Sequence, residues 1–302
     1  MTTSDTFPAS PVASPRFEPS LMRRKLAGTL FYGLCLLAIA ILILALVALM
    51  LNVFTVGLPW LNIDFITGVP SRRPTEAGIM PAIIGSIELA LMVAAITFPL
   101  GIGAAIYLAE YASDNRLTRL LQTNISNLAG VPSIIYGIFG LAIFVRLLGF
   151  GPVLFSGAAT LALVVLPLVI IASIEALKAV PQGQREGAYA LGASRWQMVR
   201  GSVLPAAAPG IMTGIILAMA RAIGEAAPLV VVGAAAFVTF PPRPFEGGFT
   251  VLPITIFDWA ERPQAAFQGL AAATIIVTLV LIFILNLLAL VVRARLSRHI
   301  QW

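Results

Sequence analysis

The sequence predicts an all-α integral membrane protein with about six transmembrane helices. Its 302 residues are 59% hydrophobic and only 11% charged, with a mean hydropathy of +0.98. A soluble domain carries about 25% charged residues. Long apolar runs also approach or exceed the ~20 residues that a helix needs to cross a bilayer. These runs are 27–53, 81–109, 125–148, 152–177, 210–240 and 269–292.

The segments around these runs divide the chain into four parts. Residues 1–22 are rich in Ser, Thr and Pro, which predicts a disordered cytoplasmic tail. Residues 23–80 would form the first transmembrane helix and an external loop, because the apolar run is too long for a signal-peptide core and has no small-residue cleavage site. Residues 81–292 would form the transmembrane core, which includes a cytoplasmic loop at 178–208. Residues 293–302 would be a cytoplasmic C-terminal tail.

Basic residues next to the predicted spans indicate the orientation of the chain. On one side lie Arg72, Arg73, Arg243 and Arg262, which are opposed there by Asp64, Glu76, Glu246, Asp258 and Glu261. The other side carries Arg23, Arg24, Lys25, Arg116, Arg119, Lys178, Arg185, Arg195, Arg200, Arg293, Arg295 and Arg298. The positive-inside rule makes this side cytoplasmic, with both termini inside. The isoelectric point of about 10.1 therefore reflects membrane topology and does not indicate nucleic-acid binding.

The reactive residue types exclude several kinds of active site. The single cysteine, Cys35, lies in an apolar run, so a disulfide framework and a thiolate metal cluster are both excluded. His299 is the single histidine, which argues against a histidine-based or zinc-based site. No stretch matches the glycine-rich Lys-Ser/Thr phosphate loop of an ATPase. We expect no catalytic residue, no metal site, no cofactor bound by this chain and no enzymatic activity.

The polar residues 175–209 have a helical pattern of their own, between two apolar runs. The pattern predicts a short helix, a turn at Gly192 and a second short helix. Leu204-Pro205 is expected to end the second helix, because proline disfavours a helical conformation in the residue before it. By composition alone, the segment could also be an amphipathic loop helix that lies on the lipid surface.

Arg221 is the charged residue placed deepest in a predicted span. If the fifth span starts near Pro209, Arg221 lies ~18 Å along it, close to the midplane. Glu225 follows one turn later and is expected to pair with it, and Pro228 would allow a kink. Two interpretations stay open. The pair is either structural and buried against a neighbouring helix, or it places a guanidinium on the path of an anion such as phosphate or a carboxylate.

Glu88 lies about two turns inside the second span, and two roles are open for it. It either faces a translocation cavity or pairs with Arg146 near the outer end of the third span. Gly210 and Gly214 form a small-xxx-small spacing that allows close contact between helices.

The segment 239–269 contains several prolines and glycines and predicts an external loop. It would include a short interfacial helix. Trp259 and Phe257 are expected at the level of the lipid headgroups.

The order of residues in the polar segment resembles the cytoplasmic "EAA" loop of permease subunits of ATP-binding-cassette (ABC) importers. The matching positions are Glu186, Gly187, Ala188, Gly192, Leu204 and Pro205, with glycine in place of the first alanine of the motif. In that family the loop forms coupling helices that dock into a groove on the ATPase subunit.

Further stretches resemble the PstA-type permeases of phosphate-specific ABC importers. These stretches are 85–112, 130–145 and ARAIGEAAPL at 220–229. In these permeases the arginine that matches Arg221 is implicated in transport, and Glu225 is the acidic position of the same motif. With Glu88, these residues are the expected substrate pathway. The N-terminal tail and the outer loops match poorly.

The resemblance implies the type I ABC importer permease fold in a bacterial plasma membrane. It also implies a complex with a PstC-like sister permease, two PstB-like ATPase subunits that use ATP and Mg, and a PstS-like phosphate-binding protein. Phosphate would enter a cavity between the two permeases, and the ATPase would switch this cavity between outward and inward access through the 186–204 loop.

Three alternatives stay open beside phosphate import. An importer for another oxyanion, such as sulfate or molybdate, is possible because arginine alone does not choose between tetrahedral anions. A secondary transporter could use a midplane arginine for an anion, but it would not need a coupling loop. A membrane-embedded enzyme would need a convergent set of nucleophile, base or metal ligands, which the deep residues do not supply.

Overall fold

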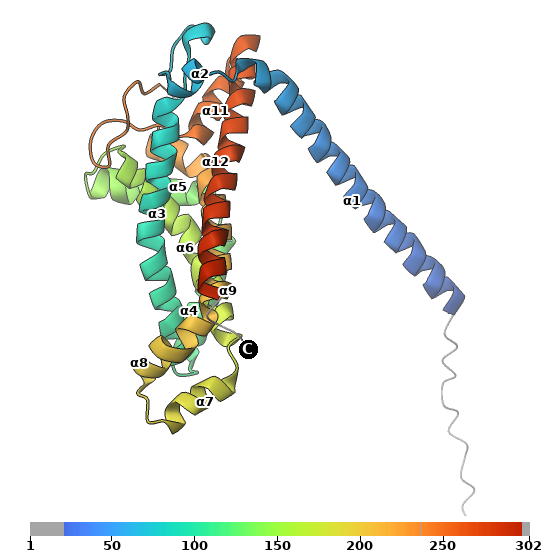
Figure 1. Cartoon of the computed structure of the whole chain (residues 1–302), viewed down its shortest axis with the longest axis vertical. Coiled ribbons are helices and arrows are strands. Elements are labelled where there is room, and N and C mark those ends of the chain that lie inside the picture. The colour runs from blue at the N-terminus through green and yellow to red at the C-terminus, as the bar shows by residue number, and fades with distance from the viewer. Residues whose placement is uncertain (1–20, 236, 298–302) are drawn as a thin grey trace, which may run out of the picture. The chain divides into compact units, whose positions relative to one another are not determined.

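The computed structural model describes residues 21–235 and 237–297 (Figure 1). Residues 1–20 of the predicted N-terminal tail and 298–302 of the predicted C-terminal tail, which include Arg298 and His299, lie outside these ranges. The chain divides after Asn52 into two units, which are described separately. The first unit contains most of α1 (Leu21–Gly57), a largely apolar helix that is long enough to cross a bilayer. The second unit contains all other described elements, and each of them is a helix.

Several helices in the described ranges are long and apolar enough to span a membrane. Five are continuous: Arg24–Trp60, Met80–Tyr111, Leu154–Lys178, Arg195–Gly224 and Ala265–Arg295. A sixth candidate is bent by 101° and consists of α4 (Arg116–Ala129), α5 (Ser133–Gly140) and the π-helical segment η4 (Leu141–Leu147). The prediction of an all-helical chain with five or six apolar spans is confirmed.

The predicted span over 125–148 is bent, because the chain changes direction at Pro132. Proline has no N–H group and disfavours a helical conformation in the residue before it, which favours a break at this point. The Tyr136 hydroxyl donates a hydrogen bond of 2.8 Å to the carbonyl oxygen of Leu128 across the bend. This bond fixes α5 against the end of α4.

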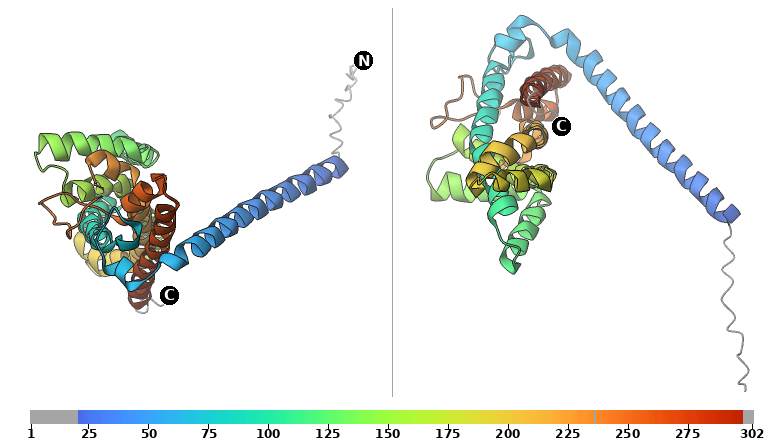
Figure 2. Two further views of the ribbon diagram at one scale, coloured as in Figure 1. Left: turned by 90° about the horizontal axis from the view of Figure 1, so that it is seen from above. Right: turned by 60° about the horizontal axis from the view of Figure 1, so that its bottom comes forward.

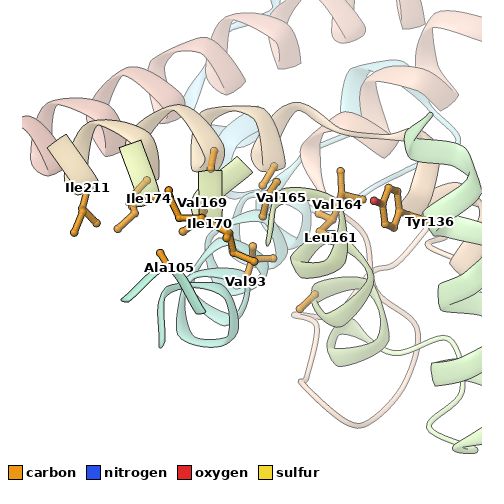
Figure 3. Packing of buried hydrophobic residues seen from close by; sticks show 14 of the residues in the cluster. Val93, Ala105, Tyr136, Leu161, Val164, Val165, Val169, Ile170, Ile174 and Ile211 are labelled. Carbon is orange, nitrogen blue, oxygen red and sulfur yellow. The ribbon is translucent and has the colours of Figure 1, made fainter. Parts of the chain in front are cut away.

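The helix α6 (Leu154–Lys178) lies at the centre of the second unit, where it contacts both α3 (Met80–Ile106) and α9 (Leu204–Gly224). Figure 3 shows apolar side chains of these three helices converging, joined by Tyr136 of α5. The labelled members of this cluster are Val93, Ala105, Tyr136, Leu161, Val164, Val165, Val169, Ile170, Ile174 and Ile211. A helix with neighbours on several sides needs an apolar surface all round, which is the sequence pattern of α6.

The helices α6 and α9 come into close contact through small residues. A Cβ atom added to Gly210 would lie 2.8 Å from the Cβ atom of Ala176, and one added to Gly214 would collide with Ala172. The close contact predicted from the glycine spacing is confirmed.

A second apolar cluster lies at the end of the unit where α2 is seen in Figure 1. The elements here are η1 (Leu58–Trp60), α2 (Ile63–Thr67), η2 (Pro74–Glu76), α11 (Leu252–Glu261) and α12 (Ala265–Ser297). Trp259 is only 1% exposed and packs 6.2 Å from Phe65 and 6.1 Å from Phe267, measured between ring centroids. The expected short helix is present as α11, in which the Trp259 ring is part of this core and Phe257 is exposed. The position of the two residues at headgroup level stays a prediction.

The helices α4, α7 and α8 lie at the opposite end of the unit from α2 (Figure 1). In the right-hand view of Figure 2, which brings this end forward, α7 and α8 lie side by side. The elements of this end are η3 (Tyr107–Tyr111), α7 (Gln182–Ala190), α8 (Arg195–Met198) and η5 (Val199–Val203), of which η3 and η5 are π-helical. The loop predicted to couple to an ATPase therefore forms one end of the unit.

Candidate functional site

Arg221 and Glu225 form the ion pair that their spacing predicts. The Nε atom of Arg221 donates to Oε1 of Glu225 over 3.2 Å. The Arg221 side chain is 43% exposed and that of Glu225 is 19% exposed, so the pair borders open space and is not enclosed in the core. Within the described residues, the two Nη groups of Arg221 have no hydrogen-bond partner. A planar guanidinium with unused donors suits an oxyanion.

The fifth span breaks after Gly224, three residues beyond Arg221, which corrects the expectation of one kinked helix over 210–240. The helix α9 ends at Gly224, and Glu225 is its C-cap with φ −82° and ψ 116°. A new short helix, α10 (Ala227–Val232), begins with Pro228 in its first turn. The proline ring would clash with the carbonyl group four residues earlier, which is that of Gly224, so the break precedes the proline.

This break leaves Arg221 in the last turn of α9. The carbonyl groups at a helix C-terminus carry partial negative charge, which stabilises a cation there. The helix α10 packs closely on α5, since a Cβ atom at Gly137 would lie only 2.8 Å from the Cα atom of Pro228. The break in the fifth span therefore lies next to the bent candidate span.

Glu88 is separate from this pair. Its Oε2 atom is buried and has no hydrogen-bond partner among the described residues. The alternative in which Glu88 pairs with Arg146 is wrong, because no ion pair joins them and Arg146 is exposed on η4. The described residues also show no hydrogen bond between Glu88 and Arg221. A role of Glu88 in a substrate pathway stays a prediction.

The predicted helix–turn–helix of the EAA-like segment is present. Gly192 has φ +79°, a conformation that favours glycine, and it separates α7 from α8. Ser194 and Gln197 form a capping box at the start of α8. Glu186 and Gly187 are exposed, whereas Ala188 packs against the main apolar cluster.

Large side chains extend outward around this turn. Leu191 is 90% exposed, and Tyr189 and Trp196 are about half exposed. This combination of exposed apolar side chains and the Glu186 carboxylate is typical of a protein-binding surface. We call the residues Glu186, Tyr189, Leu191 and Trp196 the turn surface.

The expectation that Leu204-Pro205 ends a short helix is wrong. The helix continues without a break over Arg195–Gly224. The N–H group of Leu204 bonds to the carbonyl oxygen of Val199, five residues earlier, in the π-helical segment η5. This wider turn accommodates Pro205, which has no N–H group of its own. One helix therefore connects the turn surface to Arg221.

A buried ion pair in this region was not predicted from the sequence. Arg185 of α7 donates from Nη2 to Oε1 of Glu110 over 2.7 Å, and its Nε atom lies 3.3 Å from both carboxylate oxygens. The side chains are 13% and 5% exposed. The two residues are 75 positions apart, so no local spacing links them. The signal for this pair in the sequence was Glu110, a carboxylate that directly follows the apolar run 81–109.

The described residues contain no group of three or more His, Cys, Asp or Glu side chains that could hold a metal ion.

Comparison of the sequence with known proteins finds membrane components of transport systems. Residues 98–298 match the family "Binding-protein-dependent transport system inner membrane component". The chain is 37% identical over 238 residues to a probable ABC transporter permease protein, YqgI, of Bacillus subtilis (strain 168), which covers 79% of this chain and 76% of the relative. It is 36% identical over 254 residues to the phosphate transport system permease protein PstA of Yersinia pestis, which covers 83% and 84%.

A solved structure of a bacterial alginate ABC transporter, in complex with an alginate-bound periplasmic protein, contains a similar chain. The TM-score is 0.64 at 19% identity, over 92% of this chain and 97% of that chain. At this identity the similarity shows the fold alone. The fold expected from the resemblance to importer permeases is confirmed.

Proposed function

The chain belongs to the family of binding-protein-dependent transport system inner membrane components, and we propose that it is the permease subunit through which an ATP-driven importer moves inorganic phosphate into the cell. As a member of this family, the chain is a multi-pass membrane protein and a transport subunit. The observation that carries the phosphate proposal is the 36% identity to PstA of Yersinia pestis over 83% of the chain.

The geometry at Arg221 supports an anionic substrate. Its guanidinium is permanently charged, partly exposed and held from one side by Glu225. An arriving oxyanion could bind the remaining donors without first breaking the ion pair. A charged residue of this kind in a span marks a substrate path when it borders an aqueous cavity. Arg221 would bind the anion transiently, with Glu225 holding the side chain in place between transport cycles.

The turn surface supports docking of an ATPase subunit. It combines exposed apolar side chains with the Glu186 carboxylate at one end of the unit. The continuous helix Arg195–Gly224 would carry a displacement of this surface to Arg221. Because the chain has no phosphate loop, the ATPase subunits would bind ATP and Mg. A PstB-like ATPase pair, a PstC-like sister permease and a PstS-like binding protein are the proposed partners.

The first test is phosphate uptake by cells that lack their own high-affinity system. The wild-type chain and Arg221→Gln are each expressed with the partner subunits at matched membrane levels. We expect the wild type to restore uptake and the variant to fail. Arg73→Gln is the matched control, because Arg73 also pairs with a carboxylate, that of Glu76, on an exposed surface.

The outcomes test separately the role of Arg221 and the identity of the substrate. Equal uptake by wild type and Arg221→Gln would show that Arg221 is structural. Failure of the wild type with phosphate but uptake of sulfate or molybdate would overturn the substrate and keep the importer.

The second test concerns the turn surface. Glu186→Lys reverses the exposed charge of α7, so we expect less ATPase to co-purify with the chain while membrane insertion is unchanged. Glu175→Lys is the control, because Glu175 is exposed in α6 near the same end but lies outside the turn surface. Full recovery of the ATPase with Glu186→Lys would contradict the assignment of the docking surface.

A further inference from the structure

Three elements meet at the side chain of Arg185, which is only 13% exposed. All three nitrogen atoms of its guanidinium donate hydrogen bonds. Nη2 and Nε bind the Glu110 carboxylate of η3, at the end of the second apolar span. Nη1 binds the carbonyl oxygen of Val180 over 2.7 Å, and Nη2 also binds that of Leu177 over 2.8 Å, at the C-terminal end of α6. One side chain of α7 therefore connects α7, α6 and η3.

A second arginine reaches the same segment. The guanidinium of Arg195, the first residue of α8, lies 5.2 Å from the centroid of the Tyr111 ring. Both helices of the EAA-like segment thus contact η3 at neighbouring residues. The segment η3 is π-helical, and π-helical turns often occur where a helix has a functional irregularity.

The covalent connections of the segment explain why these contacts matter. The helix α7 follows α6 after a short connection, and α8 continues through η5 into α9. The chain therefore connects the segment directly to α6 and α9, but not to α3. The interactions of Arg185 and Arg195 with η3 provide the missing connection to α3.

We propose that Arg185 and Glu110 are positioning residues that fasten α3 to the α7–α8 segment, so that the two move together when the ATPase changes state. This inference rests on the proposed coupling of that segment to an ATPase. The ion pair suits the role because a guanidinium binds a carboxylate and two carbonyl groups in one fixed orientation. Lysine has one nitrogen and cannot reproduce this arrangement.

The direct test measures the distance between α7 and η3, the segment that continues α3. Cys35, the one native cysteine, is replaced by serine, and spin labels are attached at Tyr107→Cys and Gln182→Cys, both exposed positions. The complex is studied without nucleotide and with ATP. We expect the same distance distribution in both states, and a shifted or broadened distribution with ATP when Arg185→Gln is added. A distance that changes with ATP in the unmutated pair, or that Arg185→Gln leaves unaffected in both states, would overturn the proposal.

A second readout is the amount of phosphate transported per ATP hydrolysed in vesicles. We expect Arg185→Gln and Glu110→Gln to lower this ratio about fivefold or more, at the lower end of typical coupling effects. Arg185→Lys should be intermediate. Lys178→Gln is the matched control, because Lys178 pairs with Glu175 near the same end of α6 but is exposed, and its ratio should equal that of the wild type.

A loss of complex yield with an unchanged ratio would mean that the pair is merely structural. If Arg185→Gln does not assemble, Arg185→Lys and Glu110→Gln decide the question. Absence of phosphate uptake by the wild-type complex would overturn the proposed substrate, and the spin-label distances would still test the connection between α7 and α3.

Discussion

The ion pairs Arg185–Glu110 and Arg221–Glu225 differ in their surroundings and in what they connect. Arg185 and Glu110 are nearly buried, come from separate elements and are bound to two backbone carbonyl groups as well. Arg221 and Glu225 are one helical turn apart, are joined by a hydrogen bond of 3.2 Å and border open space. The first pair holds parts of the chain together, whereas the second leaves donors accessible to a ligand.

The difference shows that an ion pair cannot be interpreted from its residue types alone. A buried charge that loses its partner stays desolvated and destabilises the protein strongly. A partly exposed charge that loses its partner is solvated by water at little cost. Mutation of the first pair should therefore lower stability as well as the phosphate transported per ATP, whereas mutation of the second should affect transport with little loss of stability.

The largest expected effect is that of Glu110→Ala, which leaves the Arg185 guanidinium buried without its carboxylate. We expect a loss of about 3–5 kcal/mol in the free energy of unfolding, measured on the purified protein in detergent. Glu76→Ala is the control, because its partner Arg73 is exposed, and it should cost no more than about 1 kcal/mol. Equal losses in the two variants would remove the distinction between buried and exposed pairs.

The next effect concerns the packing of α9, the helix that carries Arg221, against α6. Gly214→Val places a branched side chain against Ala172 of α6, so we expect a loss of about 1–3 kcal/mol by overpacking. Gly103→Val is the control in α3, where no atom lies within 4 Å of an added Cβ atom. If both variants lose the same stability, the contact between α6 and α9 is looser than described, and the cost comes from helix propensity.

A smaller effect is expected at the turn between α7 and α8. Gly192→Ala puts a Cβ atom on a residue with φ +79°, which costs about 1–2 kcal/mol. Because the turn orients the docking surface, less ATPase should co-purify. Gly183→Ala, in open space within α7, should instead stabilise the helix by about 0.5–1 kcal/mol. Unchanged ATPase recovery with Gly192→Ala would separate the turn from docking.

The smallest effect on stability is expected for Glu225→Gln. This variant keeps the size of the side chain and removes the charge beside Arg221, so unfolding should change by no more than about 1 kcal/mol. Uptake should persist, in contrast to Arg221→Gln, because the guanidinium remains. A loss of stability as large as that of Glu110→Ala would mean that the exposed pair is structural too.

Much of the candidate site was predictable because it depends on local spacing. Arg221 and Glu225 are four residues apart on one helix, so their pairing follows from helix geometry. The glycine at position 192 marks a turn that few other residues can form.

The predictions failed where neighbours override a local signal. Pro205 does not end its helix, because a π-helical turn accommodates it.

The apolar helices, the helix–turn–helix of the EAA-like segment and the pairing of Arg221 with Glu225 could be predicted from the sequence. These features depend on hydropathy and on residues within a few turns of one another. The tertiary structure alone decided which charges are buried and which remain accessible. Glu110 and Arg185 meet across 75 residues because the packing of α3 against α6 brings η3 next to the start of α7. Burial and electrostatic environment depend on such distant contacts, which no local pattern contains.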